Sequence, residues 1–599
     1  MSRIPDAWRV AQVVRSGDGA DHGMLKGLLT GLLRRGAARV AGDASAPQVG
    51  QAVRLLQLHD PAGAARICER VIERDPGMVM AWELFGVAAL NLGDYPLACE
   101  RFEHVLTLAG DDAQALANAA EANRRADRCD RALELIGRAL ARKPGFAPFL
   151  HIHVLALESS WRSDEAFAAC REALRLHPDF ASLHTSYMTL LNRVGADPAL
   201  ILEAHRRWAE RFAAPQPTDR QHRNSPQPER RLRIGYVSAD FRQHAISRFV
   251  LPLLEHHDPA LLEVYCYSNT PKTDDITRRC EALASHWRDI VALSDAAAAD
   301  LVRSDGIDVL IDLSGHTSGN RLGLFACKPA PIQVTYLGYP ATTGLSQMDY
   351  RLTDARVDPP GASEARYHER LLRLPHSLWC FAPPPQMPEV GPLPASGTGH
   401  ITFGSLNSML KLTPQLLALW SRLLVALPGS KLVLATVPEG GPRARISREF
   451  ESSGVDPARL EFHGFLPWDQ FWALHGRIDI ALDSFPCNGG ATTCETLWLG
   501  VPLVSLAGEA FLARAGLSIL STIGLPELVA HSADEYLRIA LDLARDQARL
   551  AQLRSRMRER MGASPLLAAA AFTRDLEGCY RTVWRQWCTP QIAAPGAAC

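Results

Sequence analysis

The sequence predicts a multidomain chain in which an all-α superhelix of repeats is followed by two α/β domains with parallel sheets. Three observations lead to this prediction. At 599 residues the chain is too long for a single hydrophobic core. Small and bulky residues recur with a constant period in the first third. In the remainder, short apolar segments alternate with amphipathic helical segments, as they do in folds with parallel sheets.

The composition is that of an ordinary globular protein. Lys and Arg number 64 against 65 Asp and Glu, so the basic surplus expected of a nucleic-acid-binding protein is missing. No apolar run is long enough for a membrane span, and the charged N-terminus lacks the apolar core of a signal peptide. The 13 cysteines show no paired CxxC spacing. We therefore expect reduced, mostly buried thiols in a cytoplasmic protein, without disulfides or a zinc site.

Residues 45–212 are predicted to form the helical repeats, after an N-terminal extension of residues 1–44. An alanine recurs every 34 residues, at Ala64, Ala98, Ala132 and Ala166. Pro or Gly follows the same period and is expected to end the second helix of each unit. This pattern resembles tetratricopeptide repeats. Such repeats stack into a superhelix whose concave surface suits an extended peptide substrate, and a surface for assembly or dimerisation is the alternative.

Two segments rich in Pro divide the rest of the chain. Residues 213–232 are predicted to be a linker or hinge. Ala382–Gly399 separates two α/β domains, residues 233–390 and residues 400–562. In such domains ligands bind where the carboxyl ends of the strands meet. Residues 563–599 are predicted to form a helix that packs back on the first α/β domain, followed by a disordered tail after Gln591.

The most informative motif runs from Asp483 to Leu506, where a strand end, a Gly-rich turn and a helix start follow one another. Gly489 and Gly490 lack side chains, so their backbone N–H groups can approach a ligand closely. Thr492 is predicted to open the helix, whose N-terminus suits a phosphate. Glu495 is predicted to lie in the first turn, where a carboxylate can accept both hydroxyls of a ribose. A helix capped by Thr, with no ligand, is the alternative.

Five motifs follow one another along the chain: LRIGYVSADFRQHAISRF, DGIDVLIDLSGHTSGNR, APIQVTYLGYPATTG with MDY, FGSLNSMLKLTP, and the Gly-rich motif. In this order they resemble the O-linked N-acetylglucosamine transferase / SPINDLY family, over nearly all of residues 50–560. The resemblance implies a GT-B fold for the α/β half. It also implies an inverting, metal-independent enzyme that moves a sugar from a nucleotide donor onto Ser or Thr hydroxyls of proteins, without any further cofactor.

The resemblance assigns roles to residues around the donor. Lys411 is expected at the diphosphate, where an ammonium balances the charge that develops on a departing nucleoside diphosphate. A solvated lysine at a helix start is the alternative. Asn407 is expected to face the nucleotide from the same loop. Ala491 and Thr492 are expected at the diphosphate, and Glu495 at the ribose.

The first α/β domain contributes the remaining candidates. His244 matches the histidine beside the acceptor, and imidazole suits proton removal near neutral pH. An orienting role, or none, is the alternative. The loop that lines the donor sugar corresponds to Gly338, Tyr339 and Pro340. Three weaker candidates, for which turn or structural roles are the alternatives, are Asp305, Asp308 and His316.

The base and the sugar of the donor are the open point. In HGFLPWDQFW the nucleotide-binding candidates are Leu466, Trp468 and Phe471. Trp468 and Phe471 stand where the animal O-GlcNAc enzymes place Lys and His on the uridine. An aromatic ring can stack on a base but cannot read uracil by hydrogen bonds. Gly490 and Ala491 also replace the His and Thr of the animal enzymes, so this turn looks closer to SPINDLY, whose plant members are O-fucosyltransferases that use GDP-fucose.

Three hypotheses follow. The first is a protein O-GlcNAc transferase that uses UDP-GlcNAc and whose repeats guide polypeptide substrates. The second is a protein O-fucosyltransferase that uses GDP-fucose. The third is a repeat scaffold with an inactive nucleotide-sugar domain, against which the joint presence of Lys411, His244 and Glu495 argues.

Overall fold

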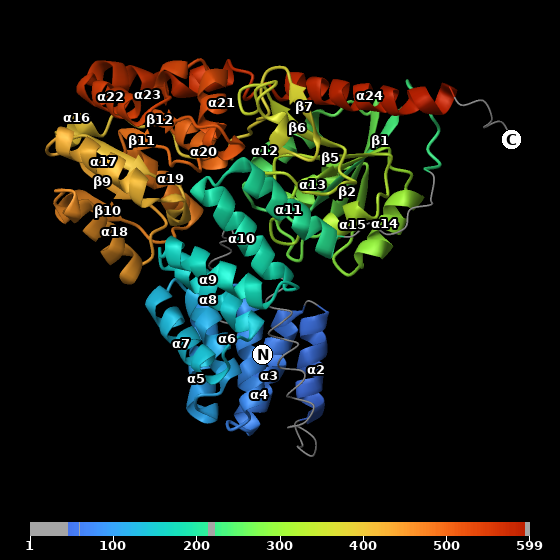
Figure 1. The fold of residues 1–599 in the computed structure, drawn as a ribbon, viewed down its shortest axis with the longest axis vertical. Coiled ribbons are helices and arrows are strands. Elements are labelled where there is room, and N and C mark those ends of the chain that lie inside the picture. The colour runs from blue at the N-terminus through green and yellow to red at the C-terminus, as the bar shows by residue number, and fades with distance from the viewer. Residues whose placement is uncertain (1–45, 59, 214–221, 594–599) are drawn as a thin grey trace.

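The computed structural model describes residues 46–58, 60–213 and 222–593. Figure 1 shows three parts, the helical repeats and two α/β domains. The helical repeats form an elongated arm below two α/β domains. The predicted architecture, all-α repeats followed by two domains with parallel sheets, is therefore confirmed. The predicted N-terminal extension and the end of the predicted tail lie outside the described residues.

The repeats consist of antiparallel helices with small residues at their contacts. The four alanines that recur every 34 residues are fully buried. At Gly86 a Cβ atom would lie 2.7 Å from the ring of Phe102, so the close approach of these two helices requires glycine. The helices are α2 (Ala46–Gln57), α3 (Pro61–Arg74), α4 (Val79–Leu92), α5 (Tyr95–Ala109), α6 (Ala113–Arg125), α7 (Cys129–Arg142), α8 (Ala147–Ser159), α9 (Ser163–Leu176), α10 (Ala181–Val194) and α11 (Pro198–Phe212).

The first α/β domain is built on a parallel sheet with the strand order β3-β2-β1-β4-β5-β6-β7. Its strands are β1 (Leu232–Ser238), β2 (Leu262–Ser268), β3 (His286–Asp289), β4 (Val309–Asp312), β5 (Ile332–Thr335), β6 (Tyr350–Asp354) and β7 (Arg370–Leu374). Its helices are α12 (Ser247–His256), α13 (Asp275–Leu283), α14 (Asp295–Ser304) and α15 (Leu322–Ala326).

The second α/β domain has a parallel sheet with the order β10-β9-β8-β11-β12-β13. Its strands are β8 (Thr402–Ser405), β9 (Lys431–Leu434), β10 (Leu460–Phe462), β11 (Ile480–Leu482), β12 (Leu503–Leu506) and β13 (Val529–Ala530). Its helices are α16 (Ala395–Thr398), α17 (Pro414–Ala426), α18 (Gly441–Ser452), α19 (Trp468–Leu474), α20 (Ala491–Trp498), α21 (Ala515–Thr522), α22 (Ala533–Arg545) and α23 (Gln547–Gly562). In each sheet the strand order reverses between two central strands, β1 and β4 or β8 and β11, where ligands of such folds bind.

The last helix, α24 (Ala569–Ala593), returns to the first α/β domain and lies along its upper side in Figure 1. Its buried residues Leu576, Tyr580 and Trp584 share one hydrophobic core with β1, β2, β4 and β5. This is the packing expected from the sequence. The indole N–H of Trp584 also donates to the carbonyl of Gln227 at 3.0 Å. The described half of the predicted linker is thus fixed on this domain and is not a free hinge.

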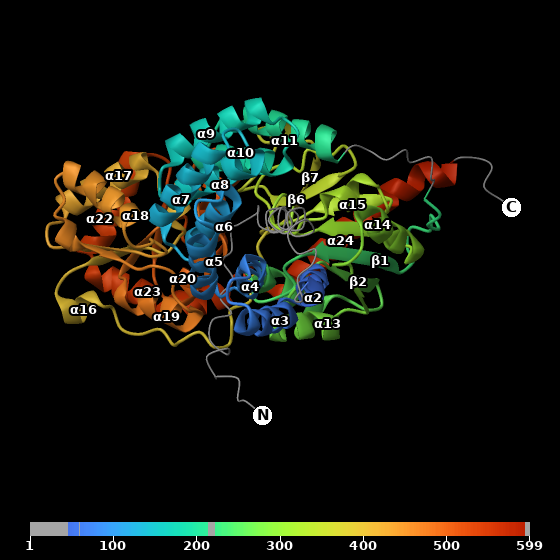
Figure 2. The same ribbon diagram turned by 90° about the horizontal axis from the view of Figure 1, so that it is seen from below.

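The repeats are joined to both α/β domains, and Figure 2 shows them as an arc that reaches from one to the other. Helices α10 and α11 share a hydrophobic core with the first α/β domain, including Met188, Leu191 and Trp208. The last two repeat helices therefore contribute side chains to the core of the first α/β domain as well as to the stack of repeats.

Candidate functional site

The Gly-rich turn leaves the carboxyl end of β11 and leads into α20. Asp483 accepts hydrogen bonds from the backbone N–H of Gly489 at 2.8 Å and from the hydroxyl of Ser505 at 2.7 Å. Burial raises the pKa of Asp483 to about 6. Helix α20 begins at Ala491, one residue before the predicted Thr492, and its N-cap is Gly490, so the alternative of a Thr cap is excluded. Its positive end is left for another acceptor.

Lys411 and Asn407 reach this turn from the loop after β8. The ammonium of Lys411, in the 3₁₀ turn η3 (Met409–Lys411), donates to the carbonyl of Asn488 at 2.7 Å. The side-chain amide of Asn407 donates to Asp483 at 3.1 Å. The structure thus brings the two strand-end loops together, as expected for neighbouring parallel strands.

Two buried oxygens at this turn lack a hydrogen-bond partner among the described residues. They are Oδ1 of Asn407 and Oγ1 of Thr493. Both converge on Gly489, where a Cβ atom would lie 2.4 Å from the Thr493 oxygen and 2.9 Å from the Asn407 oxygen. A buried polar atom without a partner costs free energy, which a bound ligand can recover. Sequence reasoning missed Thr493 because nothing in its pattern distinguishes it from Thr492.

Glu495 is the fifth residue of α20. It therefore lies after the first turn, and the prediction that it lies within that turn is wrong. Its carboxylate accepts from Nε of Arg248 at 3.1 Å and from the indole N–H of Trp472 at 3.4 Å. Burial raises the pKa of Glu495, and the nearby Arg248 opposes that shift. Arg248 belongs to α12, so this ion pair joins the two α/β domains. No pattern in the sequence indicates this ion pair.

Trp468, one of the two aromatic candidates, packs against the same arginine. The guanidinium of Arg248 lies 5.5 Å from the ring centroid of Trp468, at the start of α19. Phe471 meets Trp468 edge to face at 6.1 Å. Leu466 packs against the hydrophobic core of the second domain. All three side chains are half-buried, and Trp468 and Phe471 pack in one cluster with Trp472, whose indole donates to Glu495.

His244 lies in the loop between β1 and α12, four residues before Arg248. Its Nδ1 lies 3.8 Å from Oδ2 of Asp240, and its side chain is 20% exposed. Burial lowers the pKa of His244, so the ring is neutral near pH 7. A neutral imidazole next to a carboxylate is able to accept a proton.

The loop after β5 is shaped by contacts within the protein. A Cβ atom at Gly338 would lie 1.9 Å from the carbonyl oxygen of Leu313, so the glycine is required by the fold itself. The hydroxyl of Tyr339 accepts from Asn192 at 3.1 Å and lies 2.9 Å from Nε2 of His205. The side chain of Tyr339 therefore points into the repeats, away from a sugar at the sheet edge. Pro340 is half-buried in the same loop.

The three weaker candidates lie outside this site. Asp305 and Asp308 precede β4, at the edge of the sheet opposite to the strands' carboxyl ends. Asp305 is bound by Arg288 at 2.9 Å and Asp308 by Arg230 at 2.7 Å, so both carboxylates serve the fold. His316 is buried, with Nε2 2.9 Å from the carbonyl of Thr343.

Among the residues that the structure describes, no group of three or more His, Cys, Asp or Glu is placed to hold a metal ion. The described helices also lack the combination of length and apolar character needed to cross a membrane. The described cysteines are free thiols, and Cys579 alone among them is not fully buried.

The comparison with protein families decides the affiliation. The model of Glycosyl transferase family 41 matches residues 213–382 and 393–576, which together contain the site described above. The chain belongs to this family. The gap between the two matched segments falls in the connector between the α/β domains, and every candidate residue of the site lies within them.

Two relatives of the chain carry the same activity in their names. The chain is 40% identical, over 70% of its length, to "Probable UDP-N-acetylglucosamine--peptide N-acetylglucosaminyltransferase SPINDLY" of Solanum lycopersicum, and covers 46% of that protein. It is 31% identical, over 66% of its length, to the protein of the same name designated SEC in Arabidopsis thaliana, and covers 42% of that one. The chain thus spans about half the length of the curated relatives that it matches.

The architecture matches a solved structure of the same kind. A mutant O-GlcNAc transferase from Thermobaculum terrenum superposes with a TM-score of 0.80 at 37% identity. The match covers 87% of this chain and 99% of that one, so it includes repeats and α/β domains together. The family resemblance and the GT-B fold expected from the sequence are confirmed.

Proposed function

We propose that this chain is a protein O-glycosyltransferase that transfers GlcNAc from UDP-GlcNAc to Ser or Thr hydroxyls of polypeptides, with inversion and without a metal ion. The observation that carries the proposal is the position of Lys411 on the Gly-rich turn at the open N-terminus of α20. The ammonium of Lys411, the backbone N–H groups at the start of α20 and the hydroxyl of Thr493 can donate to a nucleoside diphosphate there, and the unpartnered amide oxygen of Asn407 can accept from a hydroxyl or N–H of the ligand.

The chemistry follows from these positions. The acceptor oxygen attacks the anomeric carbon from the face opposite to the diphosphate, so the configuration inverts while the bond from carbon to diphosphate oxygen breaks. Lys411 and the α20 N-terminus stabilise the negative charge that the diphosphate gains. The proton of the acceptor hydroxyl passes to the neutral ring of His244. Glu495 would receive the ribose hydroxyls after releasing Arg248 or Trp472.

The repeats supply the expected path for the polypeptide, because they arch over both α/β domains (Figure 2). We also propose a cytoplasmic location, which the free buried thiols favour.

A second candidate, a protein O-fucosyltransferase that uses GDP-fucose, is favoured by one contact. The guanidinium of Arg248 lies over Trp468, and an arginine can pair with O6 and N7 of guanine while the indole stacks on the base. Uracil offers no such pair of acceptors.

A thermal-shift titration with UDP, UDP-GlcNAc, GDP and GDP-fucose separates the two donors. Stabilisation by the uridine ligands is expected, and transfer of labelled GlcNAc to a peptide should follow. Stabilisation by guanosine ligands alone would replace the first proposal by the second. Binding without transfer from either sugar would leave only the inactive scaffold.

A further inference from the structure

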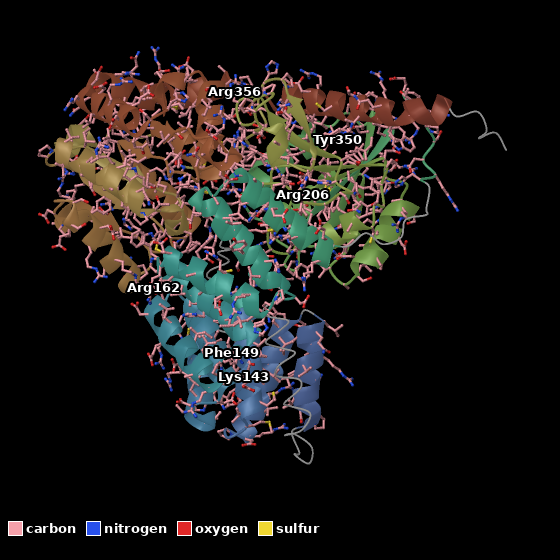
Figure 3. All side chains as sticks on the ribbon, in the orientation of Figure 1. Lys143, Phe149, Arg162, Arg206, Tyr350 and Arg356 are labelled. Carbon is pink, nitrogen blue, oxygen red and sulfur yellow. The ribbon has the colours of Figure 1, made fainter. Side chains whose placement is uncertain are left out.

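The repeats touch the second α/β domain directly beside Lys411. The indole N–H of Trp161, in the turn between α8 and α9, donates to the carbonyl of Leu412 at 2.7 Å. Leu412 is the next residue after Lys411. Arg162, which follows Trp161, marks this junction in Figure 3. The backbone φ of Trp161 is +53°, and the equivalent positions of the other repeats, Gly93, Asp127 and Gly195, are left-handed as well, so this conformation belongs to the repeat turn.

A second contact lies on the same side. Gly195, the C-cap of α10, is so close to Pro486 that a Cβ atom would lie 3.0 Å from its ring. Pro486 precedes the Gly-rich turn by two residues, and the carbonyl of Asn488 in that turn holds Lys411. The repeats thus support both loops that carry the diphosphate candidates.

The first α/β domain is held by a separate cluster. His205 lies in α11, and its Nδ1 faces the carbonyl of Ile201 at 2.6 Å. A carbonyl only accepts, so Nδ1 carries the proton, and Nε2 accepts from the hydroxyl of Tyr339. Asn192 donates to the same hydroxyl. Burial lowers the pKa of His205 to about 4, which keeps the ring neutral and this arrangement fixed.

We propose that Trp161, Asn192 and His205 are positioning residues of the donor site. Through Leu412 and Tyr339 they hold the Lys411 loop of one α/β domain and the Gly338–Pro340 loop of the other at a fixed separation. The repeats then act on the donor as well as on the polypeptide. This inference rests on the proposed function, because it takes both loops to face the nucleotide sugar.

The test uses the full chain with Trp161→Phe, Tyr339→Phe and the double variant. Each single change removes one hydrogen-bonding group. Two controls remove similar groups away from the site: Trp82→Phe, whose indole donates to Pro76 at 2.9 Å, and Tyr187→Phe on α10. Donor KM and kcat are measured well below the unfolding temperature, together with Kd for the nucleoside diphosphate.

Each single variant is expected to raise the donor KM about three- to ten-fold, the range that one lost hydrogen bond produces. The increase in donor KM of the double variant should be smaller than the product of the two single increases, because losing either hydrogen bond already releases the two loops from their fixed separation. The controls should leave KM unchanged.

The inference is overturned if both single variants keep the wild-type KM and Kd while only their unfolding temperature falls. It is also overturned if Trp82→Phe weakens the donor equally. Failure of the proposed function gives a different result, because the unmodified chain would then transfer neither sugar. In that case the Kd for the nucleoside diphosphate alone would test whether Trp161 and Tyr339 position the site. Should Trp161→Phe not fold, Tyr339→Phe still decides the outcome.

Discussion

The two α/β domains end a central strand in the same way but use the following turn differently. In the first, Asp312 at the end of β4 accepts from the backbone N–H of Gly315 at 2.9 Å and from the hydroxyl of Thr335, on the neighbouring strand, at 2.8 Å. In the second, Asp483 after β11 accepts from Gly489 and from Ser505 on the neighbouring strand. Both carboxyl groups have a raised pKa because they are buried.

What covers the two turns is different. The first turn carries His316, which packs against Trp208 of α11 with ring centroids 4.5 Å apart, so the repeats close it. The second turn faces the unpartnered oxygens of Asn407 and Thr493 and the ammonium of Lys411. The same arrangement at a strand end therefore forms a packing surface for the repeats in the first domain and a candidate ligand site in the second.

The largest effect is expected for Lys411→Ala. Removing a cation that stabilises leaving-group charge should lower kcat by about 100- to 1,000-fold, whereas the fold should remain because Lys411 is only half-buried. Steady-state transfer and a thermal melt check both parts. Lys431→Ala, at the exposed start of β9, is the control and should behave as wild type. Full activity in Lys411→Ala would remove the second turn from the mechanism.

A methyl group added to each turn should separate the two uses. Gly489→Ala brings a Cβ atom within 2.4 Å of Thr493 Oγ1 and 3.3 Å of its backbone N, so it should weaken nucleotide binding about ten-fold, with a smaller loss of stability than the change in the first turn. Gly315→Ala has φ near +53° and a Cβ atom 2.2 Å from that of Tyr339, so it should cost about 2 kcal/mol or more in unfolding free energy. Isothermal titration and denaturant melts distinguish the cases. Equal effects on stability would contradict the comparison.

Paired Thr→Val changes give a smaller effect. Thr493→Val replaces an unpartnered hydroxyl, so the unfolding temperature should hold while nucleotide affinity falls about three- to ten-fold. Thr335→Val removes a hydrogen bond to buried Asp312, so stability should fall by about 1–3 kcal/mol with affinity unchanged. The comparison fails if Thr493→Val binds as tightly as wild type.

The smallest effect concerns pH. Because burial lowers the pKa of His244 from its ordinary value, the fall of kcat/KM with decreasing pH should be centred at a lower pH than an ordinary histidine would give. Asp483, with its pKa near 6, gains a proton in a neighbouring window. A pH profile of His244→Gln separates them, because the histidine titration is absent from that variant whereas that of Asp483 is kept. A decline of the wild-type rate centred above pH 6.5 would exclude His244 as the base.

Much of the architecture could be predicted because it is written in local patterns. The 34-residue period places small residues where helices touch, and apolar strands define two parallel sheets. Lys411, Asn407 and Gly489 could be assigned to one site because their motifs resemble those of a known family, and the meeting of parallel strand ends explains why their loops lie together.

The remaining features depend on contacts between distant elements, for which the sequence holds no signal. The direction of Tyr339 is set by α10 and α11, and the pairing of Glu495 with Arg248 by the packing of two domains. Asp308 looked like a candidate acid or base, but Arg230 pairs with it at the other edge of the sheet. A side chain's partner across a fold is decided by packing, which residue type alone does not specify.

The position of α24 has a consequence for biosynthesis. The hydroxyl groups of Tyr236 in β1 and Tyr580 in α24 lie 3.2 Å apart across 344 positions of sequence. A ribosome that adds on the order of 10 residues per second completes the sheet at β7 roughly 20 seconds before it begins this helix. During that interval the surface that α24 covers is exposed, so premature termination near the 3′ end of the message would yield a chain prone to aggregation or to capture by chaperones.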